Sequence, residues 1–108
     1  MSTLSTHVLD TALGKPAPGI RVTLASPTKL LGSAVTDADG RIREFAGVGA
    51  LDAGSYVLTF AVGEYFKNGG RDSLYSNITV EFQLADAAGH HHIPLLLSPF
   101  GYSTYRGS

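Results

Sequence analysis

The stretch NITVEFQL, residues 77–84, alternates polar and apolar side chains at every position. Its apolar members are Ile78, Val80, Phe82 and Leu84. A period of two is typical of a strand, because successive side chains of a strand point to opposite faces. The stretch therefore predicts a strand with one face in a core and the other in water.

Three further stretches extend this pattern along the chain. Residues 20–25 alternate in the same way, residues 56–62 are an apolar run between two glycines, and residues 30–36 are a fourth candidate strand. Turn residues recur about every 8–12 positions, as they do in β-sandwiches and barrels. We therefore expect an all-β fold, with residues 1–108 forming a single domain.

Two local signals predict the connections. Asp39-Gly40 lies between the strand at 30–36 and a strand that begins at Arg41. Asp-Gly favours a two-residue turn in which both residues adopt positive φ, so we predict a hairpin here. Residues 64–69 predict one short helix, which Gly69 and Gly70 would end.

Residues 90–98 carry apolar side chains on both faces of a predicted strand. One face holds His91, Ile93, Leu95 and Leu97, and the other holds His90, His92, Pro94, Leu96 and Ser98. Strands of this kind are covered on both sides. One face can pack into the core of a small domain, whereas the other needs a partner subunit or a ligand. The stretch therefore predicts an oligomer.

The overall composition is that of an ordinary globular protein. Of the 108 residues, 44% are hydrophobic and 16% are charged, and the net charge is −1. Scattered basic residues predict no nucleic-acid or membrane partner, and no stretch approaches the roughly 18 apolar residues of a membrane span. The absence of cysteine excludes disulfides and thiolate metal sites. The first residues lack the pattern of a secretory signal, so we expect a cytoplasmic protein.

Several titratable residues lie near the predicted strand ends. His7 shares a strand face with Ser5 and Leu9, Arg41 directly follows the predicted turn, and His92 lies on the strand at 90–98. Each has a structural explanation when taken singly. A strand histidine is usually a hydrogen-bonded structural residue. The last four residues, Tyr105, Arg106, Gly107 and Ser108, would ordinarily form a frayed end.

The tract His90-His91-His92 raises the question of a metal site. Alternation places His91 on the opposite face from the other two histidines. Two imidazoles alone make a weak zinc site, and no carboxylate is clearly placed to complete it. We therefore predict no metal and no cofactor.

Three longer motifs point to a family when they are taken together. They are LSTHVLDTALGKPAPGIRVTL at residues 4–24, TDADGR at 36–41 and HHHIPLLLSPFGYSTYRGS at 90–108. In this order and at this length they resemble the transthyretin-like protein family, and specifically its 5-hydroxyisourate hydrolases. The ending YRGS is the most specific element, because it separates the hydrolases from the hormone-carrying transthyretins. The resemblance covers essentially the whole chain.

The resemblance implies a two-sheet sandwich of about eight strands with one short helix, assembled as a homotetramer. Active sites of the family lie in channels between dimers. By motif position, the site residues would be His7 of STH, Arg41 of DGR and His92 before Ile-Pro. The terminal tetrapeptide Tyr105, Arg106, Gly107 and Ser108 would complete the site.

The implied reaction is hydrolysis of 5-hydroxyisourate to 2-oxo-4-hydroxy-4-carboxy-5-ureidoimidazoline in urate degradation. Water must add to a cyclic amide carbonyl, and a neutral histidine suits the role of base near neutral pH. We expect His7 and His92 to orient and deprotonate water, and Arg41 to bind substrate and offset developing negative charge. Ser108 or its terminal carboxylate, together with Tyr105, would orient substrate or water. Ser108 as a covalent nucleophile is a less favoured variant.

Two non-enzymatic alternatives stay open. The first is a carrier of small hydrophobic ligands in the same channel, as in transthyretin itself. Such a carrier would not require His7, Arg41, His92 and the terminal tetrapeptide together. The second is a structural or adhesive sandwich module, for which we would expect a signal peptide, linkers or neighbouring domains.

Overall fold

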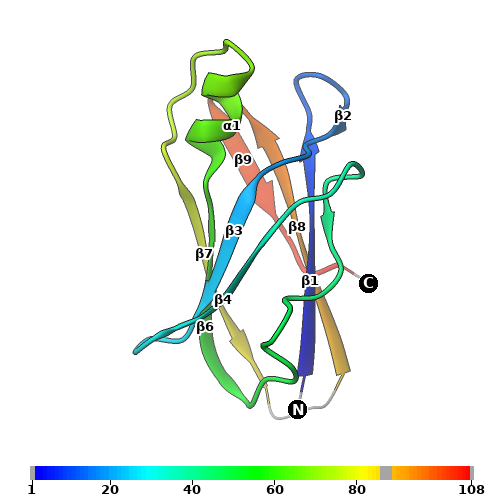
Figure 1. Cartoon of the computed structure of the whole chain (residues 1–108), viewed down its shortest axis with the longest axis vertical. Helices are drawn as coiled ribbons and strands as arrows, with labels where there is room; N and C mark the ends of the chain where they lie inside the picture. The colour runs from blue at the N-terminus through cyan, green and yellow to red at the C-terminus, as the bar shows by residue number, and fades with distance from the viewer. Residues whose placement is uncertain (1, 86–88, 108) are drawn as a thin grey trace.

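Two β-sheets packed face to face form the molecule, and one helix caps one end (Figure 1). The computed structural model describes residues 2–85 and 89–107. The first sheet has the order β2 (Lys15–Pro16), β1 (Ser2–Asp10), β8 (Gly89–Ser98) and β9 (Gly101–Thr104), and β5 (Arg41–Ile42) also pairs with β1. The second sheet has the order β4 (Leu30–Val35), β3 (Arg21–Ala25), β6 (Gly54–Phe60) and β7 (Ile78–Leu84). The expected all-β sandwich with one short helix is confirmed.

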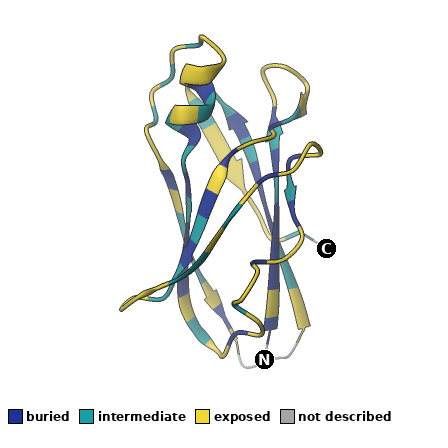
Figure 2. Cartoon of the chain, viewed as in Figure 1, coloured by how far each residue is buried: buried dark blue, intermediate teal, exposed yellow. Residues whose placement is uncertain are grey.

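The core lies between the sheets, on the faces that alternation predicted. In β7, Ile78 and Leu84 are buried, whereas Thr79 and Glu81 are exposed. Figure 2 shows buried residues along most of β1, in contrast to the exposed residues of β9. The largest fully buried apolar side chains come from both sheets and the helix: Phe60, Phe66, Ile20, Leu24, Leu58, Ile78, Leu95 and Leu97.

The pairing of β1 with β8 connects the two ends of the chain. The two strands run parallel over nine residue pairs, from Ser2↔Gly89 to Asp10↔Leu97. The buried Thr6 hydroxyl donates to the Ile93 carbonyl at 2.6 Å, so a side-chain hydrogen bond supports the same register as the backbone pairing. Because β5 and β2 pair with the other edge of β1, residues from three distant stretches of sequence meet along this strand.

The prediction of a hairpin at Asp39-Gly40 is wrong. β4 lies in the second sheet and β5 in the first, so the turn connects the two sheets instead of joining paired strands. Within the described chain, only glycines have positive φ, so Asp39 lacks the conformation that the predicted turn requires. The Asp37 carboxylate closes the turn by accepting the N–H groups of Asp39 at 2.8 Å and Arg41 at 3.0 Å. Gly40, with φ of 74°, is the left-handed residue.

The strand predicted over residues 56–62 ends two residues early. β6 stops at Phe60, and α1 (Val62–Asn68) begins at Val62, two residues before the predicted start. Val62 and Phe66 are four positions apart and fully buried, so they lie on one face of the helix. Val62, the last apolar residue of the run, is therefore buried by the helix and not by the strand. The helix ends before Gly69, as predicted. No helix within residues 2–85 and 89–107 is long and apolar enough to span a membrane.

A buried carboxylate at the end of β1 ties the helix end of the sandwich together. Asp10 has no exposed side-chain surface, and it accepts hydrogen bonds from Arg71 Nη2 at 2.6 Å and Tyr65 Oη at 2.8 Å. It also accepts the N–H groups of Ala12 and Leu13, both at 3.1 Å. Burial alone would raise the pKa of Asp10, but the hydrogen bonds from Arg71, Tyr65 and Leu13 outweigh burial and lower it.

Candidate active site

β1 and β5 bring His7 and Arg41 to neighbouring positions. The two strands are antiparallel, and His7 is paired directly with Arg41. Cross-strand partners of this kind have Cβ atoms about 4.5–5.5 Å apart. The preceding turn approaches β1 closely, because a Cβ on Gly40 would lie 2.4 Å from the Val8 carbonyl oxygen. Only glycine fits there, so the turn fixes the place where Arg41 begins its strand.

The imidazole of His7 is anchored by the turn. Its Nε2 lies 2.9 Å from the backbone oxygen of Asp39. A carbonyl can only accept, so Nε2 carries the hydrogen in this arrangement. When the ring is neutral, its Nδ1 therefore bears the lone pair. His7 is half-buried, which limits its contact with water without removing it.

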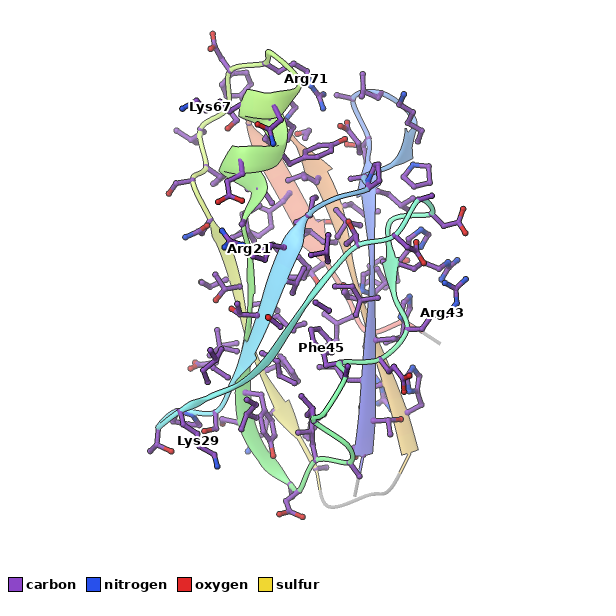
Figure 3. The ribbon with its side chains drawn as sticks, viewed as in Figure 1. Arg21, Lys29, Arg43, Phe45, Lys67 and Arg71 are labelled. Atoms are coloured by element: carbon purple, nitrogen blue, oxygen red, sulfur yellow. The ribbon has the colours of Figure 1, made fainter. Side chains whose placement is uncertain are left out.

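Arg41 and Arg43 differ in how their charges are neutralised. Arg43 Nη1 lies 2.8 Å from Asp37 Oδ2, in an ion pair exposed to solvent. The Arg41 guanidinium has no carboxylate partner within 4.0 Å among residues 2–85 and 89–107. Figure 3 shows Arg43 beside the middle of β1, away from the helix end of the molecule. Arg41 therefore retains its full set of guanidinium donors for a ligand.

His92 is on β8, which pairs with β1 along the edge opposite to the one where β5 carries Arg41. It pairs in register with Ser5, and its Nδ1 lies 2.7 Å from the Ser5 hydroxyl. The same hydroxyl lies 2.7 Å from His90 Nε2, and the other nitrogen of His90 lies 2.7 Å from the Thr3 hydroxyl. Nε2 of half-buried His92 makes no hydrogen bond to a residue that the structure describes. That nitrogen is free to meet a ligand or water.

A pocket of about 220 Å³ joins these groups. Its lining is Ser5, Thr6, Arg41, Ile42, Arg43, His90 and His92. His7 does not line this pocket, but it adjoins it through its pairing with Arg41. The structure thus brings Arg41 and His92, which are predicted site residues from distant motifs, into one cavity.

The surroundings of His92 favour its neutral form. Partial burial lowers its pKa below 6.5, and the positive charges of Arg41, His7 and His90 lower it further. A neutral imidazole can accept a proton, whereas an imidazolium cannot. The electrostatics therefore suit His92 to the role of a base at neutral pH.

The C-terminal residues divide between two places. Gly107 lies against His92: its N–H donates to the His92 carbonyl at 2.7 Å, and a Cβ on Gly107 would lie 2.6 Å from the His92 ring. Tyr105 and Arg106 instead line a second cavity of about 220 Å³, which includes His91. Within the single chain, these two predicted substrate-binding residues are therefore separate from Arg41. Ser108 lies outside the described residues.

Sequence reasoning missed Ser5 and Thr3 as members of the site and considered His90 only as a metal ligand. The sequence does contain a pattern that groups them, because Thr3, Ser5 and His7 share one face of a strand, and His90 and His92 share one face of another. What the sequence could not supply was the parallel register Thr3↔His90 and Ser5↔His92. As to metals, no group of three or more metal-ligating side chains occurs in residues 2–85 and 89–107. The Ser5 hydroxyl lies between the two histidines instead.

Comparison with protein families gives a match over residues 4–107 to the model described as "HIUase/Transthyretin family". Among curated proteins, the 5-hydroxyisourate hydrolase of Caulobacter vibrioides is 46% identical over 116 aligned positions and is covered completely, as is this chain. The corresponding hydrolase of Salmonella typhimurium is 43% identical, over 97% of this chain and 80% of the relative.

Among solved structures, a 5-hydroxyisourate hydrolase and a transthyretin both have the fold of this chain. The 5-hydroxyisourate hydrolase of Klebsiella pneumoniae superposes with a TM-score of 0.91 at 44% identity, over 100% of this chain and 94% of that chain. Transthyretin from Sparus aurata superposes with a TM-score of 0.89 at 29% identity, over 97% of this chain and 96% of that chain.

Proposed function

This chain belongs to the HIUase/Transthyretin family, and on that premise we propose that it hydrolyses 5-hydroxyisourate to 2-oxo-4-hydroxy-4-carboxy-5-ureidoimidazoline in urate degradation. The chain is an enzyme, a hydrolase that opens a cyclic amide. The observation that carries the proposal is the single pocket lined by an unpaired arginine, Arg41, and by a histidine whose Nε2 is free, His92. A carrier of apolar ligands has no need of either group.

The reaction begins with activation of water. A neutral imidazole, His92 through Nε2 or His7 through Nδ1, accepts a proton as the water oxygen bonds to the ring carbonyl carbon. The carbonyl oxygen becomes an oxyanion at this stage. The guanidinium of Arg41 donates hydrogen bonds to the planar substrate and offsets this negative charge.

Collapse of the tetrahedral intermediate completes the hydrolysis. The carbonyl re-forms, the C–N bond of the ring breaks, and the nitrogen that leaves takes a proton from the same histidine nitrogen. The histidine that removed the proton thus returns it, so the enzyme ends in its starting state. General acid–base catalysis of this kind contributes about 10²- to 10⁴-fold to the rate.

Residues 105–108 complete the site in this proposal. Tyr105, Arg106 and Gly107 bind substrate, and Ser108 orients substrate or water. Gly107 supports this role through its contact with His92. Pockets for drug-sized ligands usually measure about 300–1,000 Å³. The smaller cavity of a single chain, about 220 Å³, fits a site that needs a further wall.

We assign that wall to another copy of the chain, in a homotetramer with sites between dimers. The aromatic side chains of the β9 region support an assembly, because Phe100 is 69% exposed and Tyr102 is 44% exposed in the single chain. Exposed aromatic residues are typical of surfaces that bind another protein. We also propose that this activity is cytoplasmic.

The direct test adds freshly prepared 5-hydroxyisourate to the protein and follows the decay of its ultraviolet absorbance. The wild-type protein should accelerate the decay well above the rate in buffer, and His92→Asn should reduce kcat by about 10²- to 10⁴-fold. Size-exclusion chromatography of His92→Asn should match that of wild type, since the substitution removes a base and little volume. A wild-type rate equal to that of buffer would favour the carrier and contradict the proposal.

A further inference from the structure

A chain of hydrogen-bonding side chains leads from His92 to the protein surface. It runs from His92 Nδ1 to the Ser5 hydroxyl, to His90 Nε2, and from His90 Nδ1 to the Thr3 hydroxyl, with every step at 2.7 Å. Ser5 is buried, whereas His90 and Thr3 are exposed. The chain therefore connects a half-buried imidazole with groups in contact with solvent.

The single hydrogen of the Ser5 hydroxyl restricts the protonation states of its two neighbours. Ser5 can donate to only one imidazole nitrogen, so the other nitrogen must itself carry a hydrogen and donate to Ser5. If His92 Nδ1 donates, Nε2 of neutral His92 has the lone pair and can act as a base. If His90 Nε2 donates instead, neutral His92 carries its hydrogen on Nε2 and can act as an acid. Hydrogens that shift from His92 Nδ1 through Ser5 to His90 Nε2 leave His92 neutral only if its Nε2 gains a hydrogen at the same time, and His90, which keeps its Nδ1 hydrogen, then becomes an imidazolium.

We propose that Ser5 and His90 are positioning residues that hold His92 in its base form and take up the Nδ1 proton when Nε2 accepts one from water. This inference rests on the proposed hydrolytic function and assigns the path of its proton. In the first step, a water O–H bond breaks and His92 gains a hydrogen at Nε2. Its Nδ1 hydrogen passes to Ser5, and the hydroxyl hydrogen of Ser5 passes to His90 Nε2. His92 ends neutral, and His90 becomes an imidazolium.

Breakdown of the intermediate reverses these transfers. His92 Nε2 donates its hydrogen to the nitrogen of the breaking C–N bond. The Ser5 hydroxyl then returns a hydrogen to His92 Nδ1 and takes one back from His90 Nε2. No proton is gained or lost over the cycle, and no further reactant is needed.

Charge and burial explain why this path is favourable. Both histidines line the pocket beside Arg41 and Arg43, but a positive charge on His92 would be half-buried. The same charge on His90 is exposed to water and donates to Thr3. Ionised groups are costly to bury and are less costly in solvent. The relay moves the positive charge from the unfavourable position to the favourable one.

The decisive variant is His90→Gln, whose amide can accept a hydrogen bond from Ser5 but cannot take up a proton. It should lower kcat by about 10- to 100-fold, at or below the lower end of the range for full acid–base catalysis because the base itself remains, with KM little changed. A proton inventory in H₂O–D₂O mixtures should change from curved in wild type to linear in His90→Gln. Since His90 is exposed, the fold should tolerate this change.

Ser5→Ala and Ser5→Thr test the middle of the chain. Ser5→Ala removes the hydroxyl and should match His90→Gln in kcat and proton inventory, whereas Ser5→Thr keeps the hydroxyl and should recover most of the rate. His91→Gln is the matched control, because His91 lies on the opposite face of β8 and lines a different cavity. It should keep the curved proton inventory of wild type.

Wild-type turnover is measured first in the same assay. If wild type itself is inactive, the proposed function and the relay fail together. If wild type is active and His90→Gln retains its kcat and curved proton inventory, the relay is wrong and the hydrolytic function stands. If His90→Gln loses kcat but keeps the curved proton inventory, His90 has only a structural role and the relay is wrong.

Discussion

Two polar clusters lie along the same strand, and they differ in how completely their groups are used. At the end of β1, Asp10 accepts hydrogen bonds from Arg71, Tyr65 and two backbone N–H groups. At the middle of β1, Ser5 and His7 adjoin Arg41 and His92. Figure 3 shows Arg71 of the first cluster beside the helix, far along the molecule from Arg43 near the second.

This difference shows how a cluster that stabilises the fold can be told from one that can bind and convert a substrate. Both clusters shift a pKa, that of Asp10 and that of His92, so a shifted pKa does not separate them. In the Asp10 cluster, the carboxylate and its partners neutralise one another. In the central cluster, the Arg41 guanidinium and His92 Nε2 have no described partner. Unused hydrogen-bonding capacity beside a pocket is what a substrate requires.

The largest expected contrast is between two arginines of the same strand region. Arg41→Gln should lower kcat/KM by about 10²- to 10³-fold, because it removes the unpaired charge that stabilises the oxyanion. Arg43→Gln should change kcat/KM by no more than about fivefold, the rate equivalent of roughly 1 kcal/mol, since Asp37 already neutralises Arg43 in an exposed pair. Steady-state kinetics of both variants checks the contrast. Equal losses of kcat/KM in the two variants would show that any positive charge near the pocket matters, whether or not it is paired with a carboxylate.

Asp10→Asn should affect stability and not catalysis. Removing one partner of a buried ion pair costs about 3–5 kcal/mol, and we expect about 2–3 kcal/mol here because Arg71 is partly exposed. For a domain of this size the melting temperature should fall by roughly 10 °C. Calorimetry gives the stability, and kcat/KM at a temperature well below melting gives the activity. A loss of activity in fully folded Asp10→Asn would break the distinction between the clusters.

The same variant has a pH signature. The lowered pKa of Asp10 stabilises the fold above the unfolded pKa of about 3.9, and this contribution disappears as pH falls through the lower folded value. Wild type and Asp10→Asn should therefore converge in stability under strongly acidic conditions. A stability difference that persists there would point to packing and not charge.

A smaller effect should appear in the titration of His92. Its pKa lies below 6.5, so the acid limb of kcat/KM should have its midpoint below pH 6.5. The unfolded chain binds a proton at His92 more readily than the folded one, so this group also weakens the fold as pH falls below about 6.5. Arg41→Gln should raise the pKa of His92, as NMR titration can measure. An unchanged pKa would mean that Arg41 does not face His92; His7, His90 and Arg43 are the other charged groups around it.

Much of the fold followed from the sequence because alternation reports burial directly. The strands near residues 20–25 and 77–84 were found in this way. The turn at Asp39-Gly40 was not, since the Asp37 side chain closes it and the following strand pairs with β1 in the other sheet. The boundary at Phe60 also escaped, because Val62 is buried equally well on a strand or on a helix.

The site was only partly predictable for a related reason. His7, Arg41 and His92 were named from their motifs, and the fold brings Arg41 to His7 in one cross-strand pair. The roles of Ser5 and His90 depend on the parallel register of β1 and β8, which alternation within either strand cannot reveal. A contact between strands more than eighty residues apart is a property of the topology, and the sequence pattern of one strand carries no record of it.

The most direct test of the account is the structure of the assembled protein with a purine analogue of the substrate bound. We predict that the analogue lies between Arg41 and His92, with the guanidinium donating to a ring carbonyl oxygen and His92 Nε2 within hydrogen-bond distance of it or of an ordered water. An analogue bound in a cavity that touches neither side chain would contradict the assignment of this pocket as the catalytic site.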